Sequence, residues 1–233
     1  VLIKAPKIAV LKSDNTSSYR YGEVWHFFEQ QLEYSLIQIN ENRLQRMLSE
    51  IDVLIIPGGR YQKWSNSNSQ EKITEWILKG GKIIALSSAL NLFANTDSFA
   101  LKKKENPTQD TTSIPFSELE RNKISEITTG SIFNASIDRS HSLAFGVNRY
   151  YTLKLDADAY ELLEDQGNAF SLNSEAESVA GFIGHLAQTN QKKSLLFGEE
   201  RFGRGSLVYL VDNVLFRGFW YSGKQVFSNA LFF

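Results

Sequence analysis

Hydrophobic positions in the first 100 residues follow two alternating patterns. Short apolar runs, typical of buried strands, occupy 7–11, 51–56 and 83–86, and 34–39 alternates as a strand does. Apolar residues recur at helical spacing over 23–32, 43–49, 70–79 and 90–94, and the polar stretch 13–22 is expected to be a loop. The alternation predicts four strand-helix units and an α/β fold with a doubly wound, mostly parallel sheet, because parallel neighbours need crossover connections.

The pattern changes after residue 100. Residues 101–116 are mostly polar and predict a loop, and 117–127 predicts a helix. Strands are expected at 132–137, 150–155, 179–183, 194–199 and 206–211, with a hairpin turn at 200–205 and an amphipathic closing helix at 224–232. We therefore expect a single domain over 1–233, in which βα units fill 1–100 and a β-rich elaboration over 117–233 completes the fold.

Composition narrows the function classes. The 233 residues are 42% hydrophobic and 12% aromatic, enough for a sizeable core, and the formal charge of -1 gives no field that attracts nucleic acid. The basic cluster Lys102, Lys103 and Lys104 is interpreted as a solvated loop. The chain has no cysteine, which excludes disulfides and thiolate chemistry. No apolar run approaches the ~18 residues of a membrane span. Because the chain begins with valine, we interpret it as a piece of a longer protein.

Candidate chemistry gathers in the loops that follow the first, third and fourth strands, since ligands of doubly wound sheets bind at the carboxyl ends of the strands. The backbone N–H groups of Gly58 and Gly59 could face an oxyanion, and Ser87 and Ser88 place hydroxyls at a strand-to-helix turn. In the structural alternative, the glycines form a tight turn and the serines cap a helix.

Two stretches resemble the class I glutamine amidotransferases. Residues 55–59 (IIPGG) resemble their oxyanion loop, and 85–94 (ALSSALNLFA) resemble their nucleophile elbow. On this pattern Ser87 stands in the place of the nucleophilic cysteine, while Ala85 and Ala89 stand in the places of two glycines. The resemblance implies a flavodoxin-like, amidotransferase-like fold. Alanine is small enough for the crowded turn but disfavours positive φ.

The catalytic base of that family is missing from its expected place. The family has a histidine followed by a carboxylate after a late strand, whereas 212–218 here contain no histidine. The three histidines of the chain, His26, His141 and His185, do not match the pattern. A serine without a base is a poor nucleophile. The resemblance therefore favours the fold and argues against amidotransferase activity.

A second resemblance covers most of the chain. It rests on 16–19, 22–29, 141–146 and 211–220, which resemble the amidotransferase-like domain that follows the catalytic domain in some large secreted bacterial zinc carboxypeptidases. It implies a metallocarboxypeptidase parent, a secreted or periplasmic location and a non-catalytic accessory role for this domain. The implied partner is the catalytic domain of the same polypeptide. Zinc is implied only there, and no cofactor is expected in this domain.

A zinc site within this chain is the alternative to be weighed. His26 and Glu29 have H-x-x-E spacing, which places both side chains on one face of a helix. A third ligand would have to be His141 or His185. The alternative for this segment is a helix packed on the core with His26 hydrogen-bonded.

The remaining hypotheses concern ligands. The ligand-binding candidates are Ser17, Tyr19, Arg60, Tyr61, Ser88, Asp212 and Arg217. Asp212 and Arg217 could pair with each other or bind a polar ligand. As an alternative function, a small ligand or a glycan could bind among Tyr19, Tyr21, Tyr61 and Trp64 at the strand ends, and a peptide is a further possible partner of the domain. A serine hydrolase that uses Ser87 would need a histidine within roughly 3 Å of its hydroxyl.

Overall fold

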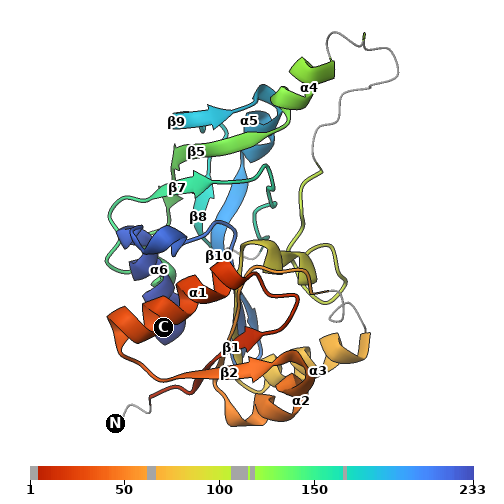
Figure 1. Cartoon of the computed structure of the whole chain (residues 1–233), viewed down its shortest axis with the longest axis vertical. Helices are drawn as coiled ribbons and strands as arrows, with labels where there is room; N and C mark the ends of the chain where they lie inside the picture. The colour runs from red at the N-terminus through yellow and green to blue at the C-terminus, as the bar shows by residue number, and fades with distance from the viewer. Residues whose placement is uncertain (1–4, 62–66, 106–114, 116–118, 165–166) are drawn as a thin grey trace.

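The central feature of the protein is an eight-stranded mixed sheet with helices on both faces (Figure 1). The structure is a computed structural model, and it describes residues 5–61, 67–105, 115, 119–164 and 167–233. The strand order is β2-β1-β3-β4-β11-β10-β8-β6. The first five strands in this order are parallel, and they are β2 (Leu36–Asn40), β1 (Ile8–Lys12), β3 (Val53–Ile56), β4 (Lys82–Leu86) and β11 (Gly205–Leu210). The predicted doubly wound, mostly parallel sheet is confirmed.

Helices cover the two faces of this sheet and enclose two hydrophobic cores. One face carries α1 (Ser18–Phe27) and α6 (Tyr221–Phe232), which lie side by side although they come from opposite ends of the chain (Figure 1). Their contact includes Phe27 and Phe227, whose ring centres are 5.4 Å apart. The other face carries α2 (Leu44–Met47) and α3 (Ser67–Leu78). The residues of β3 and β4 between these layers read as continuous apolar runs because both of their faces are buried.

The second half of the chain extends the sheet with antiparallel strands and adds a smaller sheet. The strands β10 (Ser194–Phe202), β8 (Asn168–Leu172) and β6 (Ser136–Ile137) continue the large sheet. A separate antiparallel sheet, in the order β7-β5-β9, lies at the upper end of the molecule in Figure 1. Its strands are β7 (Tyr151–Lys154), β5 (Thr128–Asn134) and β9 (Ser178–Ile183), with α4 (Leu119–Ser125) and α5 (His185–Gln191) beside them.

Several local predictions need correction. The stretch 13–22 is not all loop, because α1 begins at Ser18 and continues through Phe27 into a π-helix over Phe28–Leu32. The helix predicted over 90–94 is a 3₁₀ helix over Ser87–Leu92, which starts directly at the end of β4. The helix predicted over 43–49 is α2 flanked by 3₁₀ turns. Strand β8 and helix α5 were not predicted, since their sequences NAFSL and HLAQTNQ carry no clear apolar period.

The three lysines lie in a loop, as predicted, and Lys102 is exposed, but their side chains also contact the second half of the chain. Lys103 forms an ion pair of 2.7 Å with Asp158, and the Lys104 ammonium donates to the carbonyl oxygens of Asn190 and Lys192 at 2.9 and 2.7 Å. Lys102 is 3.2 Å from Glu164. The segment therefore fastens the two halves together, while most of the predicted loop (106–114 and 116) lies outside the described residues.

The hairpin predicted between the last two strands is confirmed. Phe202 of β10 pairs with Gly205 of β11, which leaves Gly203 and Arg204 as the turn. Gly203 has a φ of 55°, a conformation that glycine adopts without strain. In the described part of the chain, no helix has the length and apolar character that a bilayer crossing requires.

Candidate functional site

The loops that follow β1 and β3 are joined by backbone hydrogen bonds at the carboxyl edge of the sheet. The Arg60 N–H donates to the Asn15 carbonyl at 2.8 Å, and the Ser17 N–H donates to the Gly58 carbonyl at 3.0 Å. Gly59 sits so close to the first loop that a Cβ at this position would lie 2.4 Å from the Asn15 oxygen. The two loops thus form one unit, and residue 59 must be glycine for reasons of space.

Tyr61 stabilises the two joined loops through its hydroxyl group. Its buried hydroxyl donates to the Pro57 carbonyl at 2.6 Å and also contacts the Thr16 hydroxyl at 3.2 Å. Burial raises the pKa of Tyr61 to about 12. The structure thus gives this ligand candidate a structural role, in which its hydroxyl fixes the glycine loop.

Ser87 has the backbone of a nucleophile elbow. It is the first residue after β4, is half-buried and has a φ of 51°, in the left-handed region that L-residues rarely adopt. Ala85 and Ala89, which stand in the places of the family's glycines, are both fully buried, and neither has a positive φ. The alanines are therefore compatible with the turn, and the unusual conformation falls on the serine itself.

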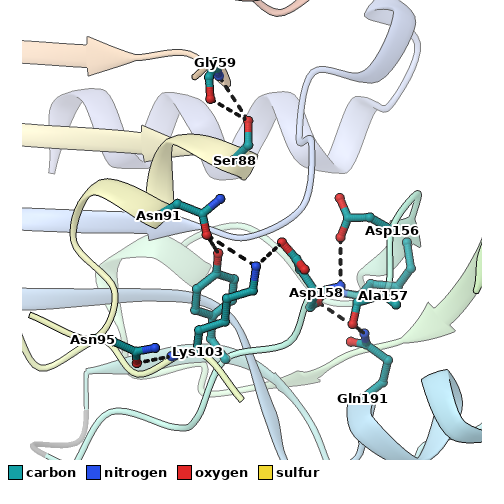
Figure 2. Close-up of polar contacts among 11 residues, drawn as sticks. Gly59, Ser88, Asn91, Asn95, Lys103, Asp156, Ala157, Asp158 and Gln191 are labelled. Atoms are coloured by element: carbon teal, nitrogen blue, oxygen red, sulfur yellow. Dashed lines mark hydrogen bonds and ion pairs between the residues drawn. The ribbon is translucent and has the colours of Figure 1, made fainter. Parts of the chain in front are cut away.

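Ser88 occupies the hydrogen-bonding position beside the glycine loop. Its hydroxyl oxygen accepts a hydrogen bond of 3.0 Å from the Gly59 N–H, as Figure 2 shows. A Cβ at position 58 would lie 3.1 Å from the same oxygen. The N–H group predicted to stabilise an oxyanion is therefore already bonded to a side chain of the protein.

The position after β11, where the family would place its histidine, holds a buried ion pair. The Asp212 carboxylate is 2.9 Å from the Lys154 ammonium, with 7% and 0% of the two side chains exposed. The Thr152 hydroxyl donates to the other oxygen of the same carboxylate, and Lys154 also lies 3.4 Å from the Asp158 carbonyl. A buried ion pair with these additional contacts forms a fixed structural group.

Arg217 does not pair with Asp212 as the sequence suggested. Its side chain is exposed and lies over the ring of Phe216, with 5.2 Å between the guanidinium carbon and the ring centre. Its backbone N–H donates to Glu23 at 3.0 Å. Lys154 was not predicted as the partner of Asp212, because a lysine in a strand is normally expected to face solvent.

A polar network continues from the elbow toward the Asp158 loop. Asn91, on the 3₁₀ helix that begins with Ser87, accepts hydrogen bonds from Tyr160 at 3.3 Å and from Lys103 at 3.4 Å (Figure 2). Lys103 then pairs with Asp158. Burial and the Asp158 carboxylate raise the pKa of Tyr160. The network joins the 3₁₀ helix after β4 to the second half of the chain, and its residues were not among the predicted site residues.

Helix α1 contacts two neighbours of the elbow, the loop after β11 and the glycine loop. The Glu23 carboxylate accepts from the Asn213 side chain at 2.8 Å and pairs with Arg20 at 3.3 Å. The Arg20 stem passes beside Gly58, within 3.3 Å of where a Cβ would stand. Helix α1 therefore contacts both the glycine loop and the loop after β11.

The histidines provide no base for Ser87. The Ser87 hydroxyl makes no hydrogen bond with any described residue, and all three histidines are described. The His141 ring nitrogen Nδ1 accepts from the Leu143 N–H at 3.2 Å, and burial lowers its pKa. His185 begins α5. The histidine required by a serine hydrolase is thus not in hydrogen-bond contact with Ser87.

The suggested zinc ligands do not belong to a metal-binding cluster of the described residues. His26 and Glu29 are both exposed, and the helix packs on the core, as expected, through Val24, Phe27 and Phe28. The described residues contain no group of three or more histidine or carboxylate side chains able to hold a metal ion. The remaining ligand candidates lie at the edge of the site: Ser17 is half-buried, and Tyr19 and Arg60 are exposed. Trp64 lies outside the described residues.

Comparison with known proteins supports the fold. No protein-family model matches the chain, and no curated protein matches it. Among solved structures, a GMP synthase candidate from Thermoplasma acidophilum is similar, with a TM-score of 0.58 and 10% identity over 98% of this chain and 94% of that one. A ThuA-like protein from Parabacteroides merdae has a TM-score of 0.57 and 12% identity over 98% and 90%.

A glutamine amidotransferase from Thermotoga maritima is also similar, with a TM-score of 0.52 and 11% identity over 90% of this chain and 76% of that one. Identities this low establish a shared fold and no shared activity. The protein therefore has a class I glutamine amidotransferase-like, flavodoxin-like fold, extended by a second antiparallel sheet.

Proposed function

We propose that this protein is a non-catalytic, amidotransferase-like accessory domain of a zinc carboxypeptidase, and that it acts by docking, substrate capture or partner binding. One observation carries the non-catalytic part of the proposal. The place of the family's histidine is filled by the buried Asp212 and Lys154 pair, while Ser87 has no hydrogen-bonded base among the described residues. A serine hydroxyl must lose its proton as it attacks, and an elbow without a base gives little rate enhancement.

The glycine loop supports the same conclusion. An oxyanion hole stabilises charge only if its N–H donors are free to face the reacting oxygen. Here the Gly59 N–H already donates to Ser88 at 3.0 Å. An oxyanion would first have to displace this hydroxyl, so the Gly59 N–H would stabilise the oxyanion less than a free N–H would.

The carboxypeptidase context is supported by the sequence stretches that resemble such accessory domains. Residues 16–19 belong to the loop joined to the glycine loop, and 22–29 lie on α1 and the π-helix that follows it. Residues 211–220 follow β11, and Leu143 within 141–146 accepts a hydrogen bond from Asn229 of α6. The resemblance therefore falls on the loop joined to the glycine loop, on α1, on the segment after β11 and on a segment bonded to α6. A catalytic domain of the same polypeptide as partner, and a secreted or periplasmic location, are part of this proposal.

The accessory role is tested in the natural polypeptide. The first measurement is whether that polypeptide contains a catalytic domain with zinc-dependent carboxypeptidase activity. The second compares peptide hydrolysis by the whole protein with hydrolysis by a version that lacks this domain. We expect kcat to be preserved and KM, product profile or thermal stability to change. A polypeptide without carboxypeptidase activity, or identical behaviour of the two versions, would contradict the accessory role.

A second candidate function is a serine hydrolase based on Ser87. The observation in its favour is the φ of 51° at a half-buried serine with no hydrogen-bonded partner in the described structure. An active serine would react with a fluorophosphonate probe, whereas Ser87→Ala would not react. Ser88→Ala is the matched control, since its hydroxyl lies one residue away. Absence of labelling in the unmodified protein would exclude this candidate.

A further inference from the structure

An aromatic groove lies on the outward face of the small sheet, away from the residues of the elbow. It has a volume of about 550 Å³ and crosses all three strands, from Tyr151 of β7 over Ile132 of β5 to Val179 of β9. Its remaining wall is the segment that leads into α6, with Phe219, Trp220 and Tyr221. We call this feature the aromatic groove.

The aromatic groove exposes apolar side chains on a fixed frame. Phe219 and Tyr221 are 51% and 78% exposed, and Val179 is also exposed. The Trp220 indole N–H donates to the Tyr151 carbonyl at 2.8 Å, which ties the aromatic wall to the sheet. Contiguous exposed apolar surface of this kind often marks an interaction site. A wall that is already fixed before binding also lowers the entropy cost of binding.

Unpaired positive charge borders the same aromatic wall. None of the described residues that line the groove carries a carboxylate, ammonium, guanidinium or imidazole group. The Lys224 ammonium lies 4.2 Å from the Tyr221 ring centre, and Arg217 lies over Phe216, whose ring centre is 5.8 Å from that of Phe219. Neither cation forms an ion pair with a carboxylate in the described part of the chain. The surface therefore offers apolar contact and, beside it, two cations that a carboxylate could neutralise.

We propose that the aromatic groove binds an extended peptide segment in which apolar or aromatic side chains stand next to carboxylates. The apolar side chains fill the groove between Ile132 and Phe219, and the carboxylates face Arg217 and Lys224. A neutral sugar would leave these cations unpaired. The proposal rests on the binding role proposed above and names the surface and the chemistry of the partner.

The test uses fluorescence anisotropy with an end-blocked, labelled peptide that alternates Asp with Leu and Phe. Two matched probes replace Asp with Lys, or Leu and Phe with Ser. We expect only the first to bind. Phe219→Ala and Tyr221→Ala should each weaken binding about tenfold, since exposed aromatic anchors dominate such contacts. Lys224→Gln should weaken it severalfold and reduce its salt dependence. Phe145→Ala is the control, because Phe145 is 64% exposed but packs on Phe233 at the other end of α6.

Retained thermal stability of each variant, together with partial rescue by Phe219→Leu, separates lost contacts from lost folding. Equal binding of the Lys probe, or no binding of the Asp probe, would overturn the proposal. So would binding only to neutral oligosaccharides, or a dimer that Phe219→Ala dissociates while no peptide binds. Turnover at Ser87 would contradict the proposed function without changing peptide binding, so the two failures can be told apart.

Discussion

The hydroxyl of Ser88 accepts a hydrogen bond of 3.0 Å from the backbone N–H of Gly59. This contact joins the turn after β4 to the loop after β3 at the point where an amidotransferase would stabilise its oxyanion. Ser87, the residue in the nucleophile's place, makes no hydrogen bond with any described residue. The side chain that is bonded is therefore the neighbour of the expected nucleophile.

Removal of the two hydroxyls should have unequal effects on stability. Ser88→Ala deprives Gly59 of its acceptor and should lower the free energy of unfolding by about 1 kcal/mol, the usual net value of one hydrogen bond. Ser87→Ala removes a hydroxyl that has no partner among the described residues. Both residues have a Cβ at the same positive φ, so the change in the free energy of unfolding should be close to zero. Urea unfolding of both variants measures the difference. A larger loss for Ser87→Ala would contradict this interpretation.

The Asp212 and Lys154 pair should be strongly coupled. Lys154→Met leaves a buried carboxylate without its cation, and the expected loss is about 3–5 kcal/mol. Asp212→Leu leaves the buried ammonium unpaired and should cost a similar amount. The double variant Lys154→Met with Asp212→Leu should be more stable than either single variant, because no buried charge remains at the pair. Additive losses in this double-mutant cycle would show that the pair does not act as a unit.

Gly59 and Gly22 provide a matched pair of glycine substitutions. At position 59 a Cβ would lie 2.4 Å from the Asn15 oxygen, so Gly59→Ala must move the two loops and should destabilise the protein by about 1–3 kcal/mol. Gly22 lies within α1, and a Cβ at its position would have no described atom within 4 Å, so Gly22→Ala should stabilise the protein by about 0.5–1 kcal/mol. Thermal unfolding of both variants checks the opposite signs.

Tyr61 predicts a loss of stability at alkaline pH. Its folded pKa of about 12 lies above the ordinary value of 10.0, so the neutral phenol is favoured in the folded state. The stability that this pKa difference gives the folded state is fully present below pH 10. It is lost as pH rises toward 12, by roughly 2–3 kcal/mol in total. Tyr61→Phe removes the hydroxyl that donates to Pro57 and should lower stability at neutral pH, but should show a smaller decline over this window. Parallel pH profiles for the two proteins would contradict the assignment.

The sequence predicted those parts of the fold in which burial dominates the pattern. The apolar runs at 51–56 and 83–86 indicated strands covered on both faces, and both contain strands of the parallel sheet. Strand β8 was missed because Asn168 and Ser171 interrupt its apolar residues. Local pattern fails where pairing with neighbouring strands determines the structure.

The candidate site was predicted only in part for a related reason. The loops after β1, β3 and β4 could be expected to meet, because carboxyl ends of parallel strands share one edge. The partner of Asp212 could not be predicted, because Lys154 lies 58 positions away in the sequence and belongs to the second sheet. The conformation of Ser87 was implied by the resemblance of its turn to a nucleophile elbow, whereas its lack of a partner among the described residues required the structure.

The central claim is that the elbow has the shape of an active site without its chemistry. The most direct test measures hydrolysis of glutamine and of an activated ester by the protein and by Ser87→Ala, with Ser88→Ala as the control. We predict no turnover above the uncatalysed rate, and no difference between the protein and Ser87→Ala. Turnover by the unmodified protein that disappears in Ser87→Ala and persists in Ser88→Ala would contradict the account.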